Sequence, residues 1–506
     1  MKFLKNIIPR EYQQKIFETC IEKNCLVILP TGLGKTLIAL MLTIERMIKF
    51  PGEKVVFLAP TKPLAEQHLI FFREHLEELF AEVQLFTGAI NSHQRKNIWE
   101  TADIIFSTPQ CIANDLKKGL YNLQKVCLLI EDEAHRCVKN YDYNFIAKQY
   151  KKQSNHPRIL GLTASPGSDS SKIKEICNNL SIETLEIRTR DSIDVKKYLQ
   201  ELEFKLEKVV FPSEFEEIRQ LLKKIYEDYI SELKLRNLLY DFPSKMNLIK
   251  LQRQLGKSCS SGNRHFNVLR GMSICANAIK LQHALELLET QTLQSFYAYL
   301  KELFRQSEKS KSKGIQQLTK KEEFILTYNK VIELIARGVE HPKVEKTEEI
   351  VTDTLSQNPK AKSIIFAQYR NTATQISKNL NKNNKIKAKV FVGQTKKSNA
   401  GINTGLSQKE QKQIIQDFSE GKINVLCATS IGEEGLDIPE VNKVIFYEPV
   451  PSEIRKIQRA GRTARVFPGE LIILITKKTR DESFHWASFS REKKMYKIMK
   501  DIKNEL

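Results

Sequence analysis

The organisation of this chain follows from one stretch, Leu29-Pro30-Thr31-Gly32-Leu33-Gly34-Lys35-Thr36. A short apolar run with β-branched residues, Cys25–Leu29, leads into it and is typical of a buried parallel strand. Apolar residues at helical spacing follow it over Leu37–Ile48. A glycine-containing turn between a strand and a helix directs backbone N–H groups and the helix dipole toward an anion. The stretch therefore predicts a phosphate-binding loop in an α/β domain.

The side chains of this loop fit a nucleotide and its metal ion. Lys35 can reach the outer phosphates, and the Thr36 hydroxyl can ligate Mg²⁺. The full phosphate-loop pattern has a glycine five residues before Gly34, but this chain has Leu29 there. The alternative is a glycine turn with a solvated lysine. The loop residues predicted to bind ATP are Thr31, Gly32, Leu33, Gly34, Lys35 and Thr36.

Composition indicates a multidomain protein with a polyanionic partner. At 506 residues the chain is long enough for about three domains of ~150 residues each. Its 81 Lys and Arg residues exceed its 60 Asp and Glu residues, which gives a formal net charge of +21 and favours nucleic acid as a partner. A lysine-rich proteome or a thermophilic surface would produce the same excess.

Cysteine spacing and hydropathy favour a cytoplasmic protein. The nine cysteines show no Cys-x-x-Cys pair or metal-ligand spacing, which suggests reduced thiols; Cys127 and Cys427, in apolar runs, are expected to fill cores. Met1–Arg10 lacks the apolar segment of a signal peptide, and no run of about 18 apolar residues occurs that could span a membrane. We therefore expect a cytoplasmic protein without a membrane partner.

Short apolar runs alternate with helical patterns in two regions, the rhythm of parallel sheets covered by helices. The expected strands are Cys25–Leu29, Lys54–Ala59, Val83–Phe86, Asp103–Ser107, Val126–Ile130 and Arg158–Leu162, then Ser363–Ala367, Lys389–Val392, Asn424–Ala428, Lys443–Tyr447 and Leu471–Ile475. Between the two regions, long helical patterns such as Phe215–Leu239 and Ala276–Phe304 replace the strand signal. The predicted divisions are an ATP-binding domain at 1–202, a helical insertion at 203–340, a second α/β domain at 341–485 and a helical tail at 486–506.

An acidic string, Ile130-Glu131-Asp132-Glu133-Ala134-His135, ends the strand that begins at Val126. Ligands collect at the carboxyl ends of strands in open α/β sheets, so Asp132 is well placed to share a Mg²⁺ ion with Thr36. Glu133 is then the candidate that orients and deprotonates the attacking water. His135 could link this site to the rest of the domain. The alternative is an acidic strand end with ordinary charges.

With this string and the phosphate loop together, the chain resembles the superfamily 2 helicases of the DEAH type, and most closely the Hef and FANCM group of branched-DNA helicases. The resemblance implies two RecA-like domains with a helical, thumb-like insertion between them, in a nucleoid-associated protein of an archaeal-type cell. The segment Pro9-Arg10-Glu11-Tyr12-Gln13 resembles the adenine-recognising motif, which implies that Arg10 and Gln13 bind the base.

Three further motifs of the family have counterparts in the first α/β region. In the family, motifs Ia and Ib touch the nucleic-acid backbone, and motif III couples the nucleotide site to strand movement. The residues that resemble motif Ia are Pro60, Thr61 and Lys62, those that resemble motif Ib are Thr108, Pro109 and Gln110, and those that resemble motif III are Thr163, Ala164 and Ser165. The resemblance implies the same roles here, with His135 as part of the coupling path.

The second α/β region resembles the family from motif IV to motif VI. For motifs IV and V, the resemblance assigns Gln368, Arg370, Thr429 and Ser430 to nucleic acid, and Gly435 and Asp437 to the nucleotide.

Motif VI resembles the segment that supplies the arginine fingers of the family. A guanidinium from a second domain stabilises the charge on the γ-phosphoryl oxygens only when the cleft closes. The resemblance assigns this chemistry to Gln458, Arg462 and Arg465. Ala464 replaces the glycine that is usual between the two arginines, and its methyl group matters only if that residue needs a positive φ.

The helical insertion contains a segment without acidic residues, from Phe242 to Leu285. Such an excess of basic side chains suits contact with phosphates, which positions nucleic acid without reading its sequence. The resemblance implies that the insertion helps to recognise forked DNA. The alternative is a helical spacer with flexible loops. The candidate phosphate ligands are Lys250, Arg253, Lys257 and Arg264.

A nuclease domain is not expected in this chain. Some archaeal relatives carry a Glu-Arg-Lys-x-x-x-Asp motif, which does not occur here; Arg491-Glu492-Lys493-Lys494 lacks its spacing. A nuclease or sliding-clamp partner, if present, is expected on another chain.

The sequence thus predicts an ATP-dependent DNA helicase or translocase that uses ATP and Mg²⁺ and acts on forked or branched DNA in repair. A first alternative is an RNA or double-stranded-RNA motor. A second is an architectural or annealing protein with a vestigial ATPase, which the set Lys35, Asp132, Glu133 and Arg462 disfavours. Strand polarity and the preferred junction do not follow from the sequence.

Overall fold

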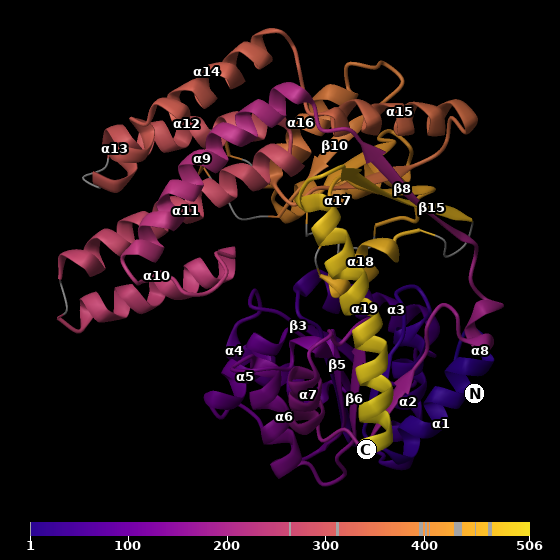
Figure 1. Ribbon diagram of the computed structural model, residues 1–506. Coiled ribbons are helices and arrows are strands. Elements are labelled where there is room, and N and C mark those ends of the chain that lie inside the picture. Colours follow the sequence, from indigo (N-terminus) through magenta and orange to yellow (C-terminus); the bar gives the residue numbers. More distant parts are fainter. Residues whose placement is uncertain are drawn as a thin grey trace.

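The computed structural model describes residues 2–262, 265–309, 313–393, 398–399, 402–403, 405–429, 438–450, 452–463 and 468–506. These residues form two α/β domains, each built on a parallel sheet, and a helical region that the chain forms between them (Figure 1). The predicted fold class, two RecA-like domains with a helical insertion, is confirmed.

The first domain is a seven-stranded sheet with strand order β3-β4-β2-β5-β6-β1-β7, and every pairing in it is parallel. Its strands are β1 Cys25–Ile28, β2 Lys54–Leu58, β3 Val83–Phe86, β4 Ile104–Ser107, β5 Val126–Asp132, β6 Ile159–Thr163 and β7 Thr184–Ile187. Its helices are α1 Glu11–Glu22, α2 Lys35–Lys49, α3 Lys62–His75, α4 Ser92–Thr101, α5 Pro109–Lys117, α6 Asp142–Gln153, α7 Ser170–Leu180 and α8 Ile193–Lys196, with a 3₁₀ turn, η1, at Ala134–Arg136.

The strand order of this sheet brings three predicted motifs together at the carboxyl ends of neighbouring strands. Strand β6 lies between β5 and β1, so the phosphate loop after β1, the acidic string at the end of β5 and the motif III segment after β6 are neighbours. Each face of the sheet carries its own apolar core, and the central strands are buried along their whole length because helices cover both faces. Buried Cys127 belongs to one of these cores, as predicted.

The second domain is a six-stranded parallel sheet with strand order β10-β13-β9-β14-β15-β8. Its strands are β8 Leu202–Val209, β9 Ser363–Phe366, β10 Ala388–Phe391, β13 Val425–Ala428, β14 Lys443–Phe446 and β15 Gly469–Thr476, and a separate antiparallel pair is formed by β11 Ser398–Asn399 and β12 Ile402–Asn403. Its helices are α15 Pro342–Gln357, α16 Arg370–Leu380, α17 Gln408–Ser419 and α18 Glu453–Ala460.

Strand β8 is a finding that the sequence did not predict. The helical insertion was expected to begin at residue 203, but residues 202–209 pair in parallel with β15 along their full length. The segment alternates charged and apolar residues, Leu-Glu-Phe-Lys-Leu-Glu-Lys-Val, as an edge strand often does to discourage pairing with other chains. The helical part therefore begins only at α9.

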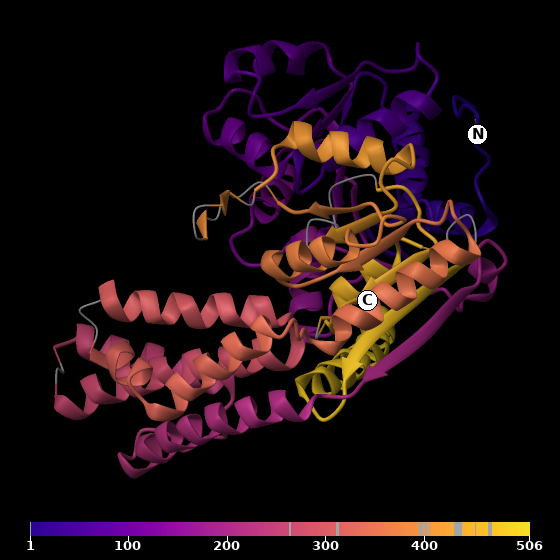
Figure 2. The same cartoon turned by 90° about the horizontal axis from the view of Figure 1, so that it is seen from above.

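The insertion is a bundle of helices that projects to one side of the two α/β domains (Figures 1 and 2). Its helices are α9 Ser213–Leu235, α10 Lys245–Ser260, α11 Phe266–Thr290, α12 Leu293–Lys309, α13 Lys313–Thr319 and α14 Glu322–Ala336, around one apolar core. The predicted continuous pattern Ala276–Phe304 is divided between α11 and α12. Gln291 is extended, and the Thr292 hydroxyl accepts a hydrogen bond from Ser295 N at 3.2 Å, which starts a new helix.

The last helix, α19 (Arg480–Glu505), joins the two α/β domains. It begins after β15 in the second domain and runs over the first (Figure 1). Met495, Met499 and Ile502 are buried in a core of the first domain. The helix starts six residues before the predicted tail, which was expected from residue 486. Within the described part of the chain, no helix has the length and apolar character needed to cross a bilayer.

Candidate nucleotide and nucleic-acid sites

Two glycines give the phosphate loop its shape. Gly32 and Gly34 adopt φ angles of 83° and 75°, in the left-handed region that favours glycine over other residues. Gly34 is the N-cap of α2, so the first turn of this helix faces the loop. Lys35 Nζ donates a hydrogen bond to the Leu29 carbonyl at 2.9 Å, which holds the ammonium group over the loop. An anion bound at this loop would therefore meet both a helix N-terminus and a lysine.

Helix α1, in the segment predicted to recognise adenine, supports this loop. Tyr12 Oη and Gln13 Nε2 both donate to the Leu33 carbonyl, at 2.7 and 3.1 Å, and Gln13 Oε1 accepts from Arg10 N at 2.8 Å. A Cβ on Gly34 would overlap Gln13 Nε2, so the glycine is also needed for this close approach. The Gln13 amide retains one N–H and one lone pair with which it could bind an adenine edge.

A histidine bridges the two predicted magnesium ligands. His68 Nδ1 lies 3.2 Å from Thr36 Oγ1, and its Nε2 lies 2.9 Å from Asp132 Oδ2. Burial acts to raise the pKa of the Asp132 carboxyl, but His68 and Lys35 outweigh this effect and hold the pKa below its ordinary value. Asp132 is therefore anionic at neutral pH, and the two oxygens lie within reach of one imidazole. This pair of hard oxygen donors fits Mg²⁺.

His68 was not predicted. It lies within α3, 32 residues after Thr36 and 64 residues before Asp132, and no motif distinguishes it. Only the tertiary structure brings it to the site.

Glu133 has the backbone and the surroundings of a functional residue. Its φ and ψ angles are 51° and 46°, a left-handed conformation that costs a non-glycine residue roughly 1–3 kcal/mol. Its side chain is buried, with Oε2 3.2 Å from His135 Nδ1, and this oxygen accepts no hydrogen bond from the described residues. A buried carboxylate next to Asp132, with a histidine beside it, is a suitable group to activate a water molecule.

A chain of contacts leads from Glu133 to the C-terminal helix. His135 Nδ1 lies 3.2 Å from Thr163 Oγ1, and the Thr163 hydroxyl bonds with Ser165 O at 3.0 Å. Ser165 Oγ donates to Met495 Sδ at 2.9 Å. The predicted coupling residues therefore lie together, with Ala164 buried beside them, and they touch a helix that originates in the second domain.

The second domain meets the phosphate loop at Gly461. A Cβ on Gly461 would overlap the Thr31 hydroxyl and lie 2.8 Å from Thr31 Cβ. Thr31 Oγ1 is buried and has no hydrogen-bond partner among the described residues. Arg462, the next residue in the chain, is 9% exposed. Gln458 is buried on the preceding helix, α18.

Some predicted residues lie outside the described part of the chain. They are Arg264 of the insertion, Ser430, Gly435 and Asp437 of motif V, and Arg465 of motif VI. Their predicted roles stay predictions.

The predicted nucleic-acid residues follow the carboxyl ends of strands in both domains. Thr61 and Thr108 are the N-caps of α3 and α5, and neither hydroxyl caps its own helix. Helix N-termini and free hydroxyls are suitable donors for backbone phosphates. The other predicted residues in such positions are Pro60 and Lys62 after β2, Pro109 and Gln110 after β4, Gln368 and Arg370 after β9, and Thr429 after β13.

Only part of the acid-free segment is available for phosphates. Lys245 pairs with Glu286 at 2.7 Å and Arg270 with Glu232 at 2.9 Å. In contrast, three cations are exposed on one face of α10 and form no ion pair with any described residue. They are Lys250, Arg253 and Lys257, three of the four predicted phosphate ligands.

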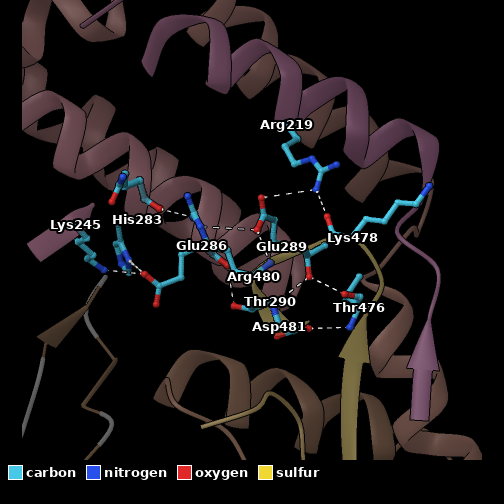
Figure 3. Close-up of polar contacts among 12 residues, drawn as sticks. Arg219, Lys245, His283, Glu286, Glu289, Thr290, Thr476, Lys478, Arg480 and Asp481 are labelled. Carbon is cyan, nitrogen blue, oxygen red and sulfur yellow. Dashed lines mark hydrogen bonds and ion pairs between the residues drawn. The ribbon is translucent and has the colours of Figure 1, made fainter. Parts of the chain in front are cut away.

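The insertion is joined to the second domain by a network of polar groups, some of them buried (Figure 3). Arg480 N donates to Glu289 Oε2 at 3.0 Å, and Arg219 Nη1 donates to the Lys478 carbonyl at 2.8 Å. Beneath them, Lys343 and Asp481 form a fully buried ion pair. Glu289 and Arg219 belong to the insertion, so it is anchored to the second domain through α9, α11 and the start of α19.

Three family models match the chain. A "DEAD/DEAH box helicase" model matches residues 10–173, a "Helicase conserved C-terminal domain" model matches 342–467, and a "Putative ATP-dependent RNA helicase, helical bundle" model matches 214–341. These spans correspond to the first domain, the second domain and the insertion. The insertion model starts close to α9 rather than at residue 203.

Individual proteins match over nearly the whole chain. A solved structure, the Pyrococcus furiosus Hef helicase domain, is 42% identical with a TM-score of 0.71, and the match covers 95% of this chain and 98% of that one. A putative ATP-dependent RNA helicase of Methanocaldococcus jannaschii is 38% identical over 98% of this chain, and the ATP-dependent DNA helicase mph1 of Neurospora crassa is 34% identical over 94%. The chain spans only 61% and 42% of the length of these last two proteins.

Proposed function

Because the chain belongs to the Hef and FANCM group of superfamily 2 helicases and is an ATP-dependent helicase enzyme, we propose that it moves on DNA and prefers forked or branched substrates. ATP use follows from the helicase family. The DNA substrate, the preference for forks and the roles of individual residues are parts of the proposal. A DNA substrate would place the work of the protein at the nucleoid, together with any nuclease or clamp carried by another chain.

The geometry of the first domain supports a defined division of roles at the nucleotide. Lys35 and the loop N–H groups bind the phosphates, and Thr36 and Asp132 hold Mg²⁺, which would neutralise charge on the phosphate oxygens when bound. Glu133, whose Oε2 lies 3.2 Å from His135 Nδ1, would orient the attacking water and take its proton. His68 keeps Thr36 and Asp132 facing each other before the nucleotide arrives.

Closure of the cleft would complete this site. The contact between Gly461 and Thr31 brings the segment that carries Arg462 against the phosphate loop. Arg462 would then stabilise the charge that develops on the γ-phosphoryl oxygens. Since α19 and the motif III residues touch the same region, closure and release would be transmitted to both domains and would step them along one strand.

The observation that carries the preference for forks is the row of unpaired cations on α10. The two motor domains present hydrogen-bond donors to the backbone of one strand. Contacts to a single strand give the protein no reason to prefer a fork. Lys250, Arg253 and Lys257 lie on a separate, projecting part of the molecule, where they could contact the phosphates of a duplex arm. Because the insertion is anchored to the second domain, such a contact would move with the motor.

A second candidate is an RNA motor. The helical-bundle model and the M. jannaschii relative both carry RNA helicase in their descriptions. The 2′-hydroxyl distinguishes the two substrates, since a protein that needs it cannot use DNA of the same shape.

The test is ATP turnover in the presence of forked DNA, single-stranded DNA and the matching RNA strands. We expect the fork to stimulate most and RNA least. The Glu133→Gln variant should bind ATP and fail to hydrolyse it with every substrate, which identifies the measured activity as that of this site. Greater stimulation by RNA would favour the second candidate, and turnover that no nucleic acid changes would overturn the motor function altogether.

A further inference from the structure

A groove of about 970 Å³ lies where the insertion meets the second domain. It is lined by residues of α11, α12 and α14 from the insertion and of α16 from the second domain, and α12 packs against α16 at this junction. Its volume is in the range of sites that bind small organic groups. Neither the nucleotide site nor the α10 cations use it.

Aromatic rings dominate the walls of this groove. At one end, His283 packs edge-on against Tyr299 with ring centroids 4.8 Å apart, and it lies 5.8 Å from Tyr369. At the other end, Tyr297 is stacked on Tyr328 at 5.6 Å. Phe304 completes this second group, 4.7 Å from Tyr328. All four tyrosines are only partly buried, so each keeps some ring surface that a planar ligand could cover.

Side-chain amides lie between the aromatic groups. Gln294, Asn371 and Gln375 line the groove, and none of the three side chains makes a hydrogen bond with another described residue. An amide presents a donor and an acceptor side by side, which is the pattern that matches the edge of a nucleobase. Aromatic faces together with free amides are the means by which proteins hold unstacked bases.

The charges of the groove suit bases better than phosphates. Lys301 and Arg305 are balanced by Glu302 and Glu308, and Arg305 is paired with Glu302 at 2.6 Å. A nearly neutral groove has little attraction for a phosphate chain. It does adjoin surfaces predicted to bind phosphates, because Tyr369 lies between Gln368 and Arg370, and Tyr299 Oη donates to the carbonyl of Lys280 in the acid-free segment at 3.2 Å.

We propose that this groove binds unpaired bases of a single strand by stacking them on Tyr297, Tyr299, Tyr328 and Tyr369, while Gln294, Asn371 and Gln375 meet their edges. The proposal rests on the proposed function and deepens it, because it assigns a base-binding site to a motor whose other predicted contacts are to the backbone. Such a site would hold a strand at the fork after its partner has been displaced. Stacking is tolerant of sequence, as a motor requires.

The test compares an ordinary single strand with an abasic strand of equal length and charge. Wild-type protein should bind the abasic strand about 5- to 150-fold more weakly for each stacked base that is lost. The Tyr297→Ala/Tyr328→Ala variant should reduce this ratio, because two of the four stacking rings are lost, whereas Tyr297→Phe/Tyr328→Phe, which keeps both rings, should retain the wild-type ratio. The single variant Tyr297→Ala should reduce the ratio by a smaller amount and changes packing least, because the Tyr297 hydroxyl contacts only that of Tyr328 among the described residues.

Two results would overturn the proposal. Equal binding of both strands by wild-type protein would mean that bases are not held, and an unchanged ratio in the alanine variants would mean that they are held elsewhere. In both cases a partner protein would be left as the occupant of the groove. Failure here is separate from failure of the proposed function, because stimulation of ATP turnover by forked DNA is measured independently of base contact.

Discussion

Arg462 is the residue on which the proposed chemistry depends most. It belongs to a domain without a phosphate loop and follows Gly461, which lies against Thr31, and it is buried. Arg462→Ala should bind ATP almost normally and lose turnover by ~10³-fold or more, the scale known for arginine fingers. The control is Arg455→Ala, which removes an exposed arginine from α18, the helix that precedes Arg462, and should leave turnover unchanged. A large loss of ATP affinity with little further loss of turnover would show that Arg462 binds the ground state instead.

Gly461 should tolerate no side chain at all. A Cβ there would overlap Thr31, which is part of the phosphate loop and cannot move far. Gly461→Ala should therefore hold the cleft open and lower ATP turnover strongly, while thermal unfolding shows that the protein still folds. Gly256→Ala is the matched control, since its Cβ meets nothing within 4 Å and should stabilise helix α10 by up to about 1 kcal/mol. Wild-type turnover by Gly461→Ala would show that the two domains separate at this contact during hydrolysis.

Glu448 should make stability depend on pH. Burial raises the pKa of its carboxyl to about 7, although Lys343 and Arg459 act in the opposite direction. Between the ordinary value of 4.5 and this one, the folded protein keeps a proton that the unfolded chain releases, so the free energy of unfolding falls as pH rises. Glu448→Gln removes this titration. The difference in Tm between variant and wild type should grow from about pH 5 to about pH 7 and then level off; a constant difference would contradict the assignment.

Residues in local motifs could be predicted, and residues that join distant segments could not. Gly32, Gly34 and Glu133 stand out in the sequence because each belongs to a short string whose chemistry needs that residue type. His68 gives no such signal, since its partners lie 32 and 64 residues away. Met495, which contacts Ser165 across 330 residues, is invisible for the same reason.

At the scale of helices and strands, the contacts of Glu289 and Arg219 with the second domain form a joint (Figure 3). This joint decides whether the insertion acts as part of the motor. Glu289→Ala removes the acceptor of Arg480 N and leaves Arg219 and Arg480 without their buried carboxylate. We expect stimulation of ATP turnover by forks to fall toward the level given by single strands, with faster hydrogen exchange at the adjoining ends of α9 and α11. Glu217→Ala is the control, because its exposed pair with Lys330 should contribute little. An unchanged ratio of fork to single-strand stimulation would show that the joint is not needed.

Strands with uniform apolar composition were predictable, whereas the edge strands β7 and β8 were not. The buried strands β1, β2, β4 and β5 are continuous apolar runs, and their burial on both faces leaves the sequence little freedom. Edge strand β8 alternates charged and apolar residues and is partly exposed, so it resembled the start of a surface helix. The break between α11 and α12 depends on the local bonds of Thr292, which the apolar period does not reveal.

At the scale of the whole molecule, one helix and one joint connect the three parts. Helix α19 leaves the joint with the insertion, passes the second domain and buries Met495, Met499 and Ile502 in the first. The number and order of the parts could be predicted from the sequence. This connection could not, because α19 shows no periodicity that would distinguish a solvent-exposed tail from a helix packed between domains.

The central claim is that a motor common to the family gains its preference for forks from the insertion, and salt titration tests it most directly. Neutralising Lys250, Arg253 and Lys257 to Gln should flatten the slope of log K against log [salt] on forked DNA by about 2 to 3 units, at ~0.9 per lost duplex phosphate contact. On plain single strands the slope should change much less. The control triple variant changes Lys360, Lys385 and Lys387 to Gln. These exposed lysines precede the strands β9 and β10, so they lie at the amino ends of the strands, whereas the predicted motifs follow the carboxyl ends. Equal flattening on both substrates, or none on the fork, would contradict the account.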